Sequence, residues 1–173
     1  LVGLTRLRDG TGAFPAADEL IALAAEVRAI LPDAEISYAA DWTEYGAYRP
    51  DDGSNDLVFP LDDFWMDSNC DFIGIDWYAP LSDWRDGDHL DGDLWNDIHD
   101  PEYLSANIEG GEGYEWYYAN QTDRDAQIRT PISDTVSGED WIFRVKDLKS
   151  WWSTEHHNRP GGVRESFSNV WQA

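Results

Sequence analysis

The chain has 173 residues, of which 35 are Asp or Glu and 12 are Lys or Arg, so its formal net charge is −23. A surface this acidic repels the phosphate backbone of DNA and RNA, which makes nucleic acid the least favoured class of partner. The single cysteine rules out an intrachain disulfide, and no apolar run approaches the roughly 20 residues that a membrane span needs.

The ends of the chain look internal. Residue 1 is Leu rather than Met, it lies inside an apolar run, and residues 169–173 carry no signal that stops a helix. The length supports one domain with a core, but a complete eight-stranded α/β barrel typically takes about 250 residues. We therefore expect residues 1–173 to form a single fragment of a domain that is truncated at both ends.

The first half of the chain alternates short apolar runs with a helical pattern. Apolar residues recur at helical spacing from Leu20 to Leu31, and Pro15 suits the first turn of that helix. This order indicates a parallel sheet with right-handed crossovers. The expected elements are a strand at 1–5, a helix at 15–31, a strand at 35–41, a short helix at 61–66 and a strand at 72–78.

The second half is less regular. Residues 81–115 are rich in Asp, Gly and Trp and form a long excursion after the third strand. Helices are expected at 101–108 and 114–129, and residues 141–152 begin like a strand and finish like a helix. The predicted fold class is therefore α/β, a partial TIM-type (β/α)8 barrel with an acidic, Trp-rich excursion after the third visible strand.

Two of the predicted strands end in carboxylates and aromatic rings. In α/β barrels, the active site lies at these C-terminal ends of the strands. Glycosidic cleavage needs two carboxyl groups, and aromatic rings pack well against the apolar faces of sugars. The candidate residues for the wall of a sugar site are Asp41, Glu44, Asp76 and Tyr78. The candidate sugar-binding rings are Trp42, Tyr45, Trp77 and Trp84.

This interpretation makes a geometric prediction and has an alternative. The prediction is that one open face holds Asp41, Trp42, Asp76, Trp77 and Tyr78. The alternative is that Asp41 and Asp76 only accept hydrogen bonds from the loops that they begin.

A calcium site is a weaker hypothesis, because carboxylates alternate with turn residues in Asp86, Asp88, Asp91 and Asp93. Oxygen ligands on a flexible loop suit Ca²⁺, but the spacing does not match an EF-hand, and a solvated acidic loop is the alternative. No other cofactor or metal is expected. The adjacent residues His156 and His157 point apart and make a poor chelating pair.

Several long segments resemble one known family, the TIM-barrel-like domain of gene transfer agent particles. They are residues 36–45, 72–86, 110–119, 127–132 and 151–163, so the resemblance runs in order along nearly the whole chain. In the family this domain sits in the tail-tip hub protein of the phage-like particle. The resemblance implies a particle made in the bacterial cytoplasm and a glycoside-hydrolase-like barrel that engages or cleaves cell-envelope polysaccharide or peptidoglycan beside other tail proteins.

The resemblance assigns no catalytic residue here. The family's two expected catalytic glutamates lie in a Gly-Ser-Glu segment before the strand that matches residues 1–5 and in a later Thr-Glu-Leu-Gly segment, and neither lies within residues 1–173. The chain alone is therefore expected to be inactive. The alternatives are a non-catalytic glycan-binding or structural tail domain, and a free-standing glycosidase.

Overall fold

The computed structural model describes residues 3–168, which divide into two compact units. The first unit holds the chain up to Trp77 together with the residues from Trp151 on, and the second unit holds Tyr78–Ser150. Within the described residues there are two separate two-stranded pairings and no closed barrel. None of the helices in that range has the length and apolar character that crossing a membrane would require.

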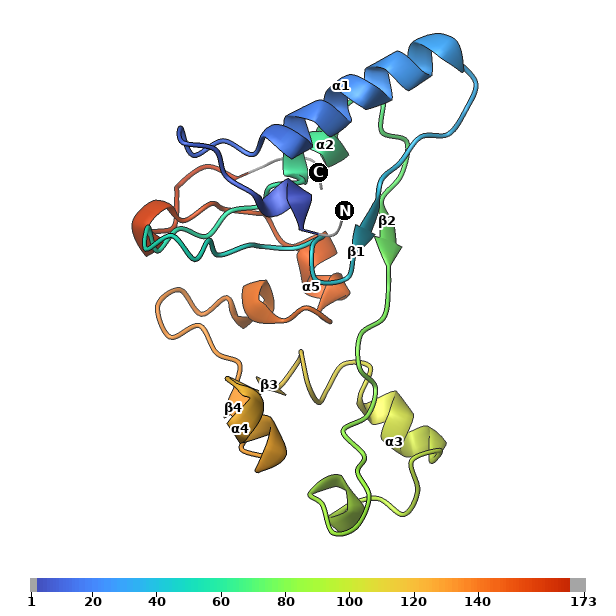
Figure 1. Cartoon of the computed structure of the whole chain (residues 1–173), viewed down its shortest axis with the longest axis vertical. Coiled ribbons are helices and arrows are strands. Elements are labelled where there is room, and N and C mark those ends of the chain that lie inside the picture. Colours follow the sequence, from blue (N-terminus) through green and yellow to red (C-terminus); the bar gives the residue numbers. More distant parts are fainter. Residues whose placement is uncertain (1–2, 169–173) are drawn as a thin grey trace. The chain divides into compact units, whose positions relative to one another are not determined.

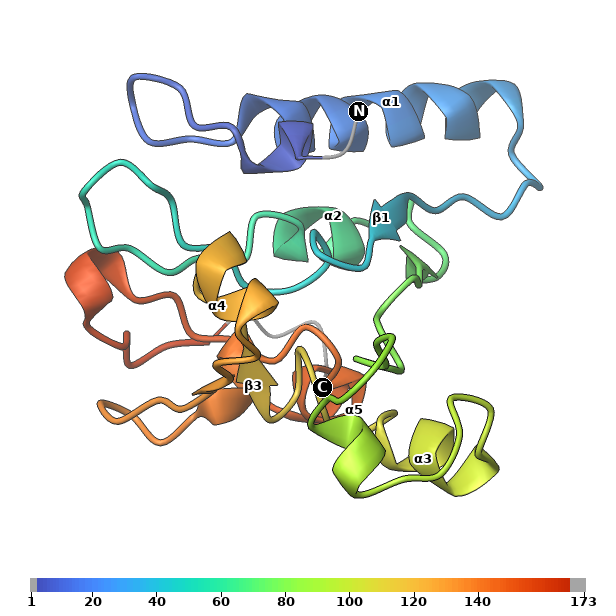
Figure 2. The same cartoon turned by 60° about the horizontal axis from the view of Figure 1, so that its bottom comes forward.

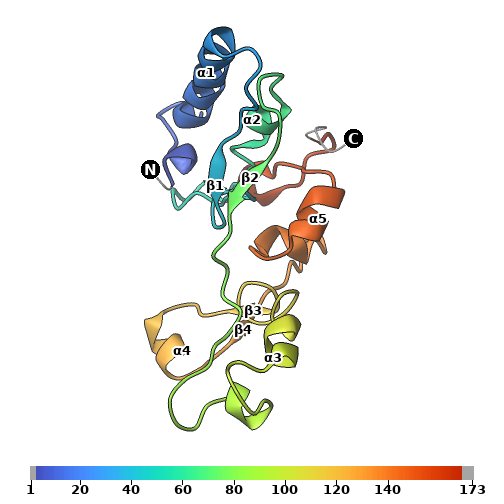
Figure 3. The same cartoon turned by 90° about the vertical axis from the view of Figure 1, so that its right-hand side faces the viewer.

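The first unit contains a short parallel strand pair. Strand β1 (Ala39–Asp41) pairs with β2 (Gly74–Asp76), and Figures 1 and 3 show the two arrows side by side and pointing the same way. A Cβ atom on Gly74 would lie 3.0 Å from the carbonyl oxygen of Tyr38. Glycine at this position therefore lets the two backbones approach closely.

Helix α1 (Pro15–Ile30) confirms the prediction for 15–31 and packs near helix α2 (Asp62–Met66), as Figure 1 shows. Its contact side is narrow, because Ala17 and Ala24 are its buried residues. Three of its predicted apolar positions are instead exposed, namely Leu23, Ile30 and Leu31. The helix therefore keeps an apolar surface open to solvent.

The late segment of the chain closes the first unit through backbone pairing. Residues Tyr48 and Val58 form an antiparallel bridge, and Leu57 forms a second one with Arg159. Helix α5 (Leu148–Ser153) precedes this segment, and a 3-10 turn at Pro160–Gly162 follows the bridge. The core of the unit contains Tyr45, Leu57, Phe59, Leu61, Phe64, Trp65 and Trp151.

The second unit consists of short elements joined by loops. Helix α3 (Pro101–Ala106) and helix α4 (Gln121–Asp125) flank strand β3 (Trp116–Tyr117), which pairs antiparallel with β4 (Thr130–Pro131); Figure 2 labels α3, α4 and β3. Short 3-10 helices occupy Asp91–Asp93 and Asp140–Phe143. The core of this unit contains Tyr103, which is only 1% exposed, together with Trp116, Ile132 and Ile142.

The α/β class and the helices at 15–30, 62–66 and 101–106 agree with the sequence prediction, and three expectations were wrong. The predicted strand at 1–5 is a 3-10 turn over Leu4–Arg6, with residues 1–2 outside the described range. The predicted helix at 114–129 is a strand followed by α4, because Asn120 caps a new helix with its side chain. The start of 141–152 is a 3-10 helix rather than a strand.

Candidate functional site

The carboxyl edge of β1 and β2 brings the two predicted aspartates together. Asp41 and Asp76 are register partners on the parallel strands, so their side chains leave the same side of the sheet. The Trp42 amide donates to the Asp76 carbonyl at 3.0 Å and extends the pairing by one residue. Neighbouring strands lie about 4.8 Å apart, which places the two carboxylates as neighbours at this edge.

The two aspartates differ in their local partners. Oδ1 of Asp41 accepts hydrogen bonds from the Thr43 amide at 2.9 Å and the Thr43 hydroxyl at 2.5 Å. Asp41 therefore does organise the loop that it begins, as the alternative interpretation proposed. Asp76 is exposed to solvent. One carboxylate of the pair is thus held by its loop, and the other faces water.

An aromatic cluster lies beside this edge. The ring of Trp77, 37% exposed, lies 6.3 Å from the ring of Tyr45, which makes an edge-on contact with Trp151 at 5.0 Å. Tyr45 is only 3% exposed, so its ring packs against Trp77 and offers little surface to a ligand. Trp42, which follows β1, is half-buried.

Glu44 is an interior residue, only 1% exposed. Its carboxylate accepts hydrogen bonds from the Thr5 hydroxyl, from the Tyr38 hydroxyl at 3.0 Å and from the Gly3 amide at 3.3 Å. Burial, together with the bond to Glu44, raises the pKa of Tyr38 to about 12. Glu44 thus ties the N-terminal turn to the loop after β1.

The remaining candidates, Tyr78 and Trp84, belong to the second unit. Tyr78 is 77% exposed. Trp84 is half-buried and makes edge-on contacts with His89 at 4.5 Å and with Tyr103 at 5.8 Å. Of the residues predicted to share one open face, the strand register brings Asp41 and Asp76 together. That the face also holds Trp42, Trp77 and Tyr78 stays a prediction.

A buried charge network organises the second unit around Arg129. Its Nη2 atom donates to Asp83 at 2.8 Å and to Asp91 at 2.6 Å, and its guanidinium carbon lies 4.1 Å from the centre of the Trp116 ring. Each aspartate side chain is only 9% exposed. One guanidinium thus links two carboxylates that come from different parts of the segment at 81–93.

Two tyrosine hydroxyls complete this network. Tyr103 donates to Asp91 at 2.6 Å and accepts from the Asp83 amide at 3.0 Å, while Tyr118 donates to Asp83 at 2.6 Å. Burial opposes ionisation of Asp83, but the bonds from Tyr118 and Arg129 outweigh it and hold the pKa of Asp83 below its usual value. Burial and the bond to Asp91 raise the pKa of Tyr103.

The four residues of the calcium hypothesis divide into two groups. Asp91 is buried and uses both carboxylate oxygens in the network, Oδ1 with Arg129 and Oδ2 with Tyr103. The other three, Asp86, Asp88 and Asp93, are exposed. Across residues 3–168, no three His, Cys, Asp or Glu side chains are grouped closely enough to hold a metal ion.

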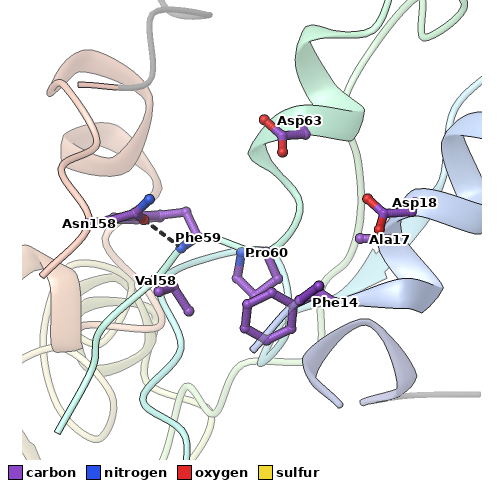
Figure 4. A pocket seen from close by; sticks show the side chains of 9 residues that line it. Phe14, Ala17, Asp18, Val58, Phe59, Pro60, Asp63 and Asn158 are labelled. Carbon is purple, nitrogen blue, oxygen red and sulfur yellow. Dashed lines mark hydrogen bonds between the residues drawn. The ribbon is translucent and has the colours of Figure 1, made fainter. Parts of the chain in front are cut away.

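Each unit also contains a pocket. In the first unit, a pocket of about 230 Å³ lies between α1 and α2, and Figure 4 shows the carboxylates of Asp18 and Asp63 and the rings of Phe14 and Pro60 around it. In the second unit, a pocket of about 250 Å³ is lined by aromatic and polar side chains that include Asp91 and Arg129.

Sequence reasoning missed Arg129, Tyr103 and the structural role of Asp91. A usable signal was present, because 35 Asp and Glu outnumber 12 Lys and Arg, so each arginine has many carboxylates as possible partners. Arg85, Arg124 and Arg129 all form ion pairs within the second unit. The sequence does not show which carboxylate pairs with Arg129, because Asp83 and Arg129 lie 46 residues apart in the chain.

The first unit combines helices with a parallel strand pair, which agrees with the α/β class. The chain belongs to the GTA TIM-barrel-like domain family, whose family model matches residues 1–173. This finding confirms the resemblance seen in the sequence. No curated protein matches the chain at a significant level.

Proposed function

We propose that this chain is part of a glycoside-hydrolase-like barrel in the tail hub of a gene transfer agent, and that the carboxyl edge of β1 and β2 contacts cell-envelope glycan. The family supports the association with a gene transfer agent. The observation that carries the glycan proposal is the shared register of Asp41 and Asp76 beside the exposed ring of Trp77.

The chemistry of this edge suits the binding of sugar more than its cleavage. Asp41 is engaged by Thr43, and Glu44 is buried among donors, so neither is poised to exchange a proton with a ligand. Asp76 can accept hydrogen bonds from sugar hydroxyls, and Trp77 offers an aromatic surface held by Tyr45. We therefore assign this edge a binding role and no catalytic residue.

Co-sedimentation of the chain with purified peptidoglycan and with cell-surface polysaccharide tests the proposal. The unaltered chain should pellet with at least one of these polymers. Trp77→Ala and Asp76→Asn should each weaken binding, Trp77→Ala by about tenfold or more if the ring is a main contact. The matched controls are Trp152→Ala, an exposed ring on α5, and Asp51→Asn, an exposed turn carboxylate.

Two results would overturn this assignment. If the chain pellets with neither polymer, a purely structural role in tail assembly becomes the better account. If Trp77→Ala and Trp152→Ala pellet equally well, the glycan contact lies away from the β1–β2 edge. Release of reducing ends by the chain would show cleavage and would contradict the assignment of a binding role alone.

A further inference from the structure

The pocket of the second unit has the composition of a site for a small hydroxylated ring. Three aromatic side chains line it from separate parts of the chain, namely Trp95, Tyr103 and Trp116. The rings of Trp95 and Tyr103 lie 5.6 Å apart at a tilt of 46°, so they form an angled wall rather than a closed stack. An angled aromatic wall suits a flat, amphipathic ligand that has one apolar face.

Polar groups are fixed around the same pocket. Asp91 is held in place by hydrogen bonds from Arg129 and from the hydroxyl of Tyr103. Arg129 is held in turn by Asp83. Asn107 donates through its Nδ2 to the Tyr103 carbonyl at 2.9 Å, which leaves its Oδ1 as an acceptor. Such pre-positioned groups bind a ligand without losing side-chain freedom on association.

Two further polar groups have capacity left for a ligand. Glu115 is exposed and accepts from the Gly111 amide at 3.0 Å through Oε2, while its other oxygen accepts no hydrogen bond from the residues that the structure describes. Arg129 also lines the pocket, and its side chain is 19% exposed, so a ligand can reach part of it.

Size and charge narrow the ligand class. The pocket holds about 250 Å³, below the roughly 300–1,000 Å³ of pockets for drug-sized molecules, so it fits one ring rather than an extended chain. Its lining contains Asp91 and Glu115 against the single cation Arg129. An anionic ligand would meet excess negative charge there.

We propose that this pocket binds one neutral pyranose ring, as a second glycan contact separate from the carboxyl edge of β1 and β2. The sugar's apolar face packs on Trp95 and Trp116, and its hydroxyls exchange hydrogen bonds with Asn107, Glu115 and Arg129. The choice of ligand class rests on the proposed function. The lining residues themselves belong entirely to the second unit.

The test is a titration of the whole chain with methyl glucoside and with N-acetylglucosamine, followed by NMR of the tryptophan indole N–H signals. Saturable shifts of the Trp95 and Trp116 signals are expected with at least one of these neutral sugars. Glucuronate, which carries a carboxylate, should bind about tenfold more weakly or not at all.

A filling variant separates loss of binding from loss of folding. Ala106 is exposed on α3 and lines the pocket, so Ala106→Trp should block the site without removing a core contact. Ser105→Trp, on the same helix and outside the lining, is the matched control and should bind like the unaltered chain. Unchanged spectra elsewhere would confirm that both variants fold.

The titration and the pelleting experiment together distinguish failure of the pocket assignment from failure of the proposed function. The absence of a saturable shift with either neutral sugar, or an equal response of Ala106→Trp and Ser105→Trp, would overturn the pocket assignment. If the chain still pellets with glycan in that case, and Trp77→Ala still weakens pelleting, the proposed function stands while the second contact fails. If pelleting is also absent, both fail. Tighter binding of glucuronate than of the neutral sugars would overturn the charge argument.

Discussion

Asp62 and Asp63 are adjacent on α2, yet their carboxylates have opposite surroundings. Both oxygens of Asp62 lie 3.0 Å from Nδ1 of His156, and both residues are buried. The other ring nitrogen of His156 lies 2.8 Å from the Trp151 carbonyl, so both nitrogens of this buried ring are within hydrogen-bond distance of a partner. Asp63 faces the pocket with Asp18, and no cation pairs with either of them within residues 3–168.

The buried contact between Asp62 and His156 should contribute strongly to the stability of the fold. Asp62→Asn removes the carboxylate that contacts the buried ring of His156, which should lower the free energy of unfolding by about 1–3 kcal/mol. Asp63→Asn is the matched control on the same helix and should change stability by about 0.5 kcal/mol or less, in the stabilising direction at neutral pH. Urea unfolding of the two variants measures both effects. Similar losses in the two would contradict the pairing.

The effect of Asp63 should depend on pH. Burial, then the neighbouring charges of Asp62 and Asp18, raise the pKa of Asp63, so the ionised carboxylate weakens the folded state. Its protonated form favours folding at low pH, and this contribution is lost as pH rises through the folded pKa. Asp63→Asn should therefore exceed the unaltered chain in stability at pH 7, and the gap should close towards pH 3. A gap that widens on acidification would refute this.

Arg129 should hold the second unit together. Arg129→Met leaves Asp91 buried without its cation and leaves Asp83 with Arg85 alone, which should cost about 3–5 kcal/mol. Hydrogen exchange of amides in residues 78–150 measures this loss locally. Arg124, which pairs with Glu112 and is 43% exposed, provides the control, and Arg124→Met should cost about 1 kcal/mol or less. Equal protection in the two variants would show that the network contributes little.

Lys146 should make stability rise in mildly alkaline solution. Its ammonium is buried and donates to the carbonyls of Asn107 and Gly110 at 2.7 and 2.9 Å, and burial lowers the pKa of Lys146 from 10.5 to about 8. Between those values the unfolded chain binds a proton that the folded chain has released, so stability increases with pH.

Urea unfolding at intervals from pH 7 to 10 measures this dependence. The unaltered chain should gain stability relative to Lys146→Met by on the order of 1–3 kcal/mol over that range. Lys149→Met removes an exposed lysine nearby and should track the unaltered chain. Parallel curves for all three proteins would contradict the assignment.

Local patterns predicted the elements that local chemistry determines. Helix α1 follows from Pro15 and the apolar spacing that reaches Leu31, and the prediction was correct to within one residue at its end. The run at 1–5 misled because Gly3 adopts a φ of +84° and begins a 3-10 turn, which its apolar neighbours do not reveal. Asn120 likewise divides 114–129, since its side chain caps a new helix at the Asp123 amide.

The candidate site was predictable only where topology fixes it. The meeting of Asp41 and Asp76 follows from two parallel strands that end in the same way. The burial of Glu44 was not predictable, because its partner Thr5 lies 39 residues earlier in the chain. The pairs that Arg129 makes with Asp83 and Asp91 depend in the same way on long-range packing that no local pattern contains.

The exposed apolar side of α1 has a colloidal consequence. Leu23, Ile30 and Leu31 offer a surface through which copies of the chain can adhere, while a net charge of −23 keeps those copies apart. Added salt shortens the range of this repulsion, to about 8 Å at physiological ionic strength and about 3 Å at 1 M. Concentrated salt should therefore favour self-association of this chain, whereas dilute buffer should keep it dispersed.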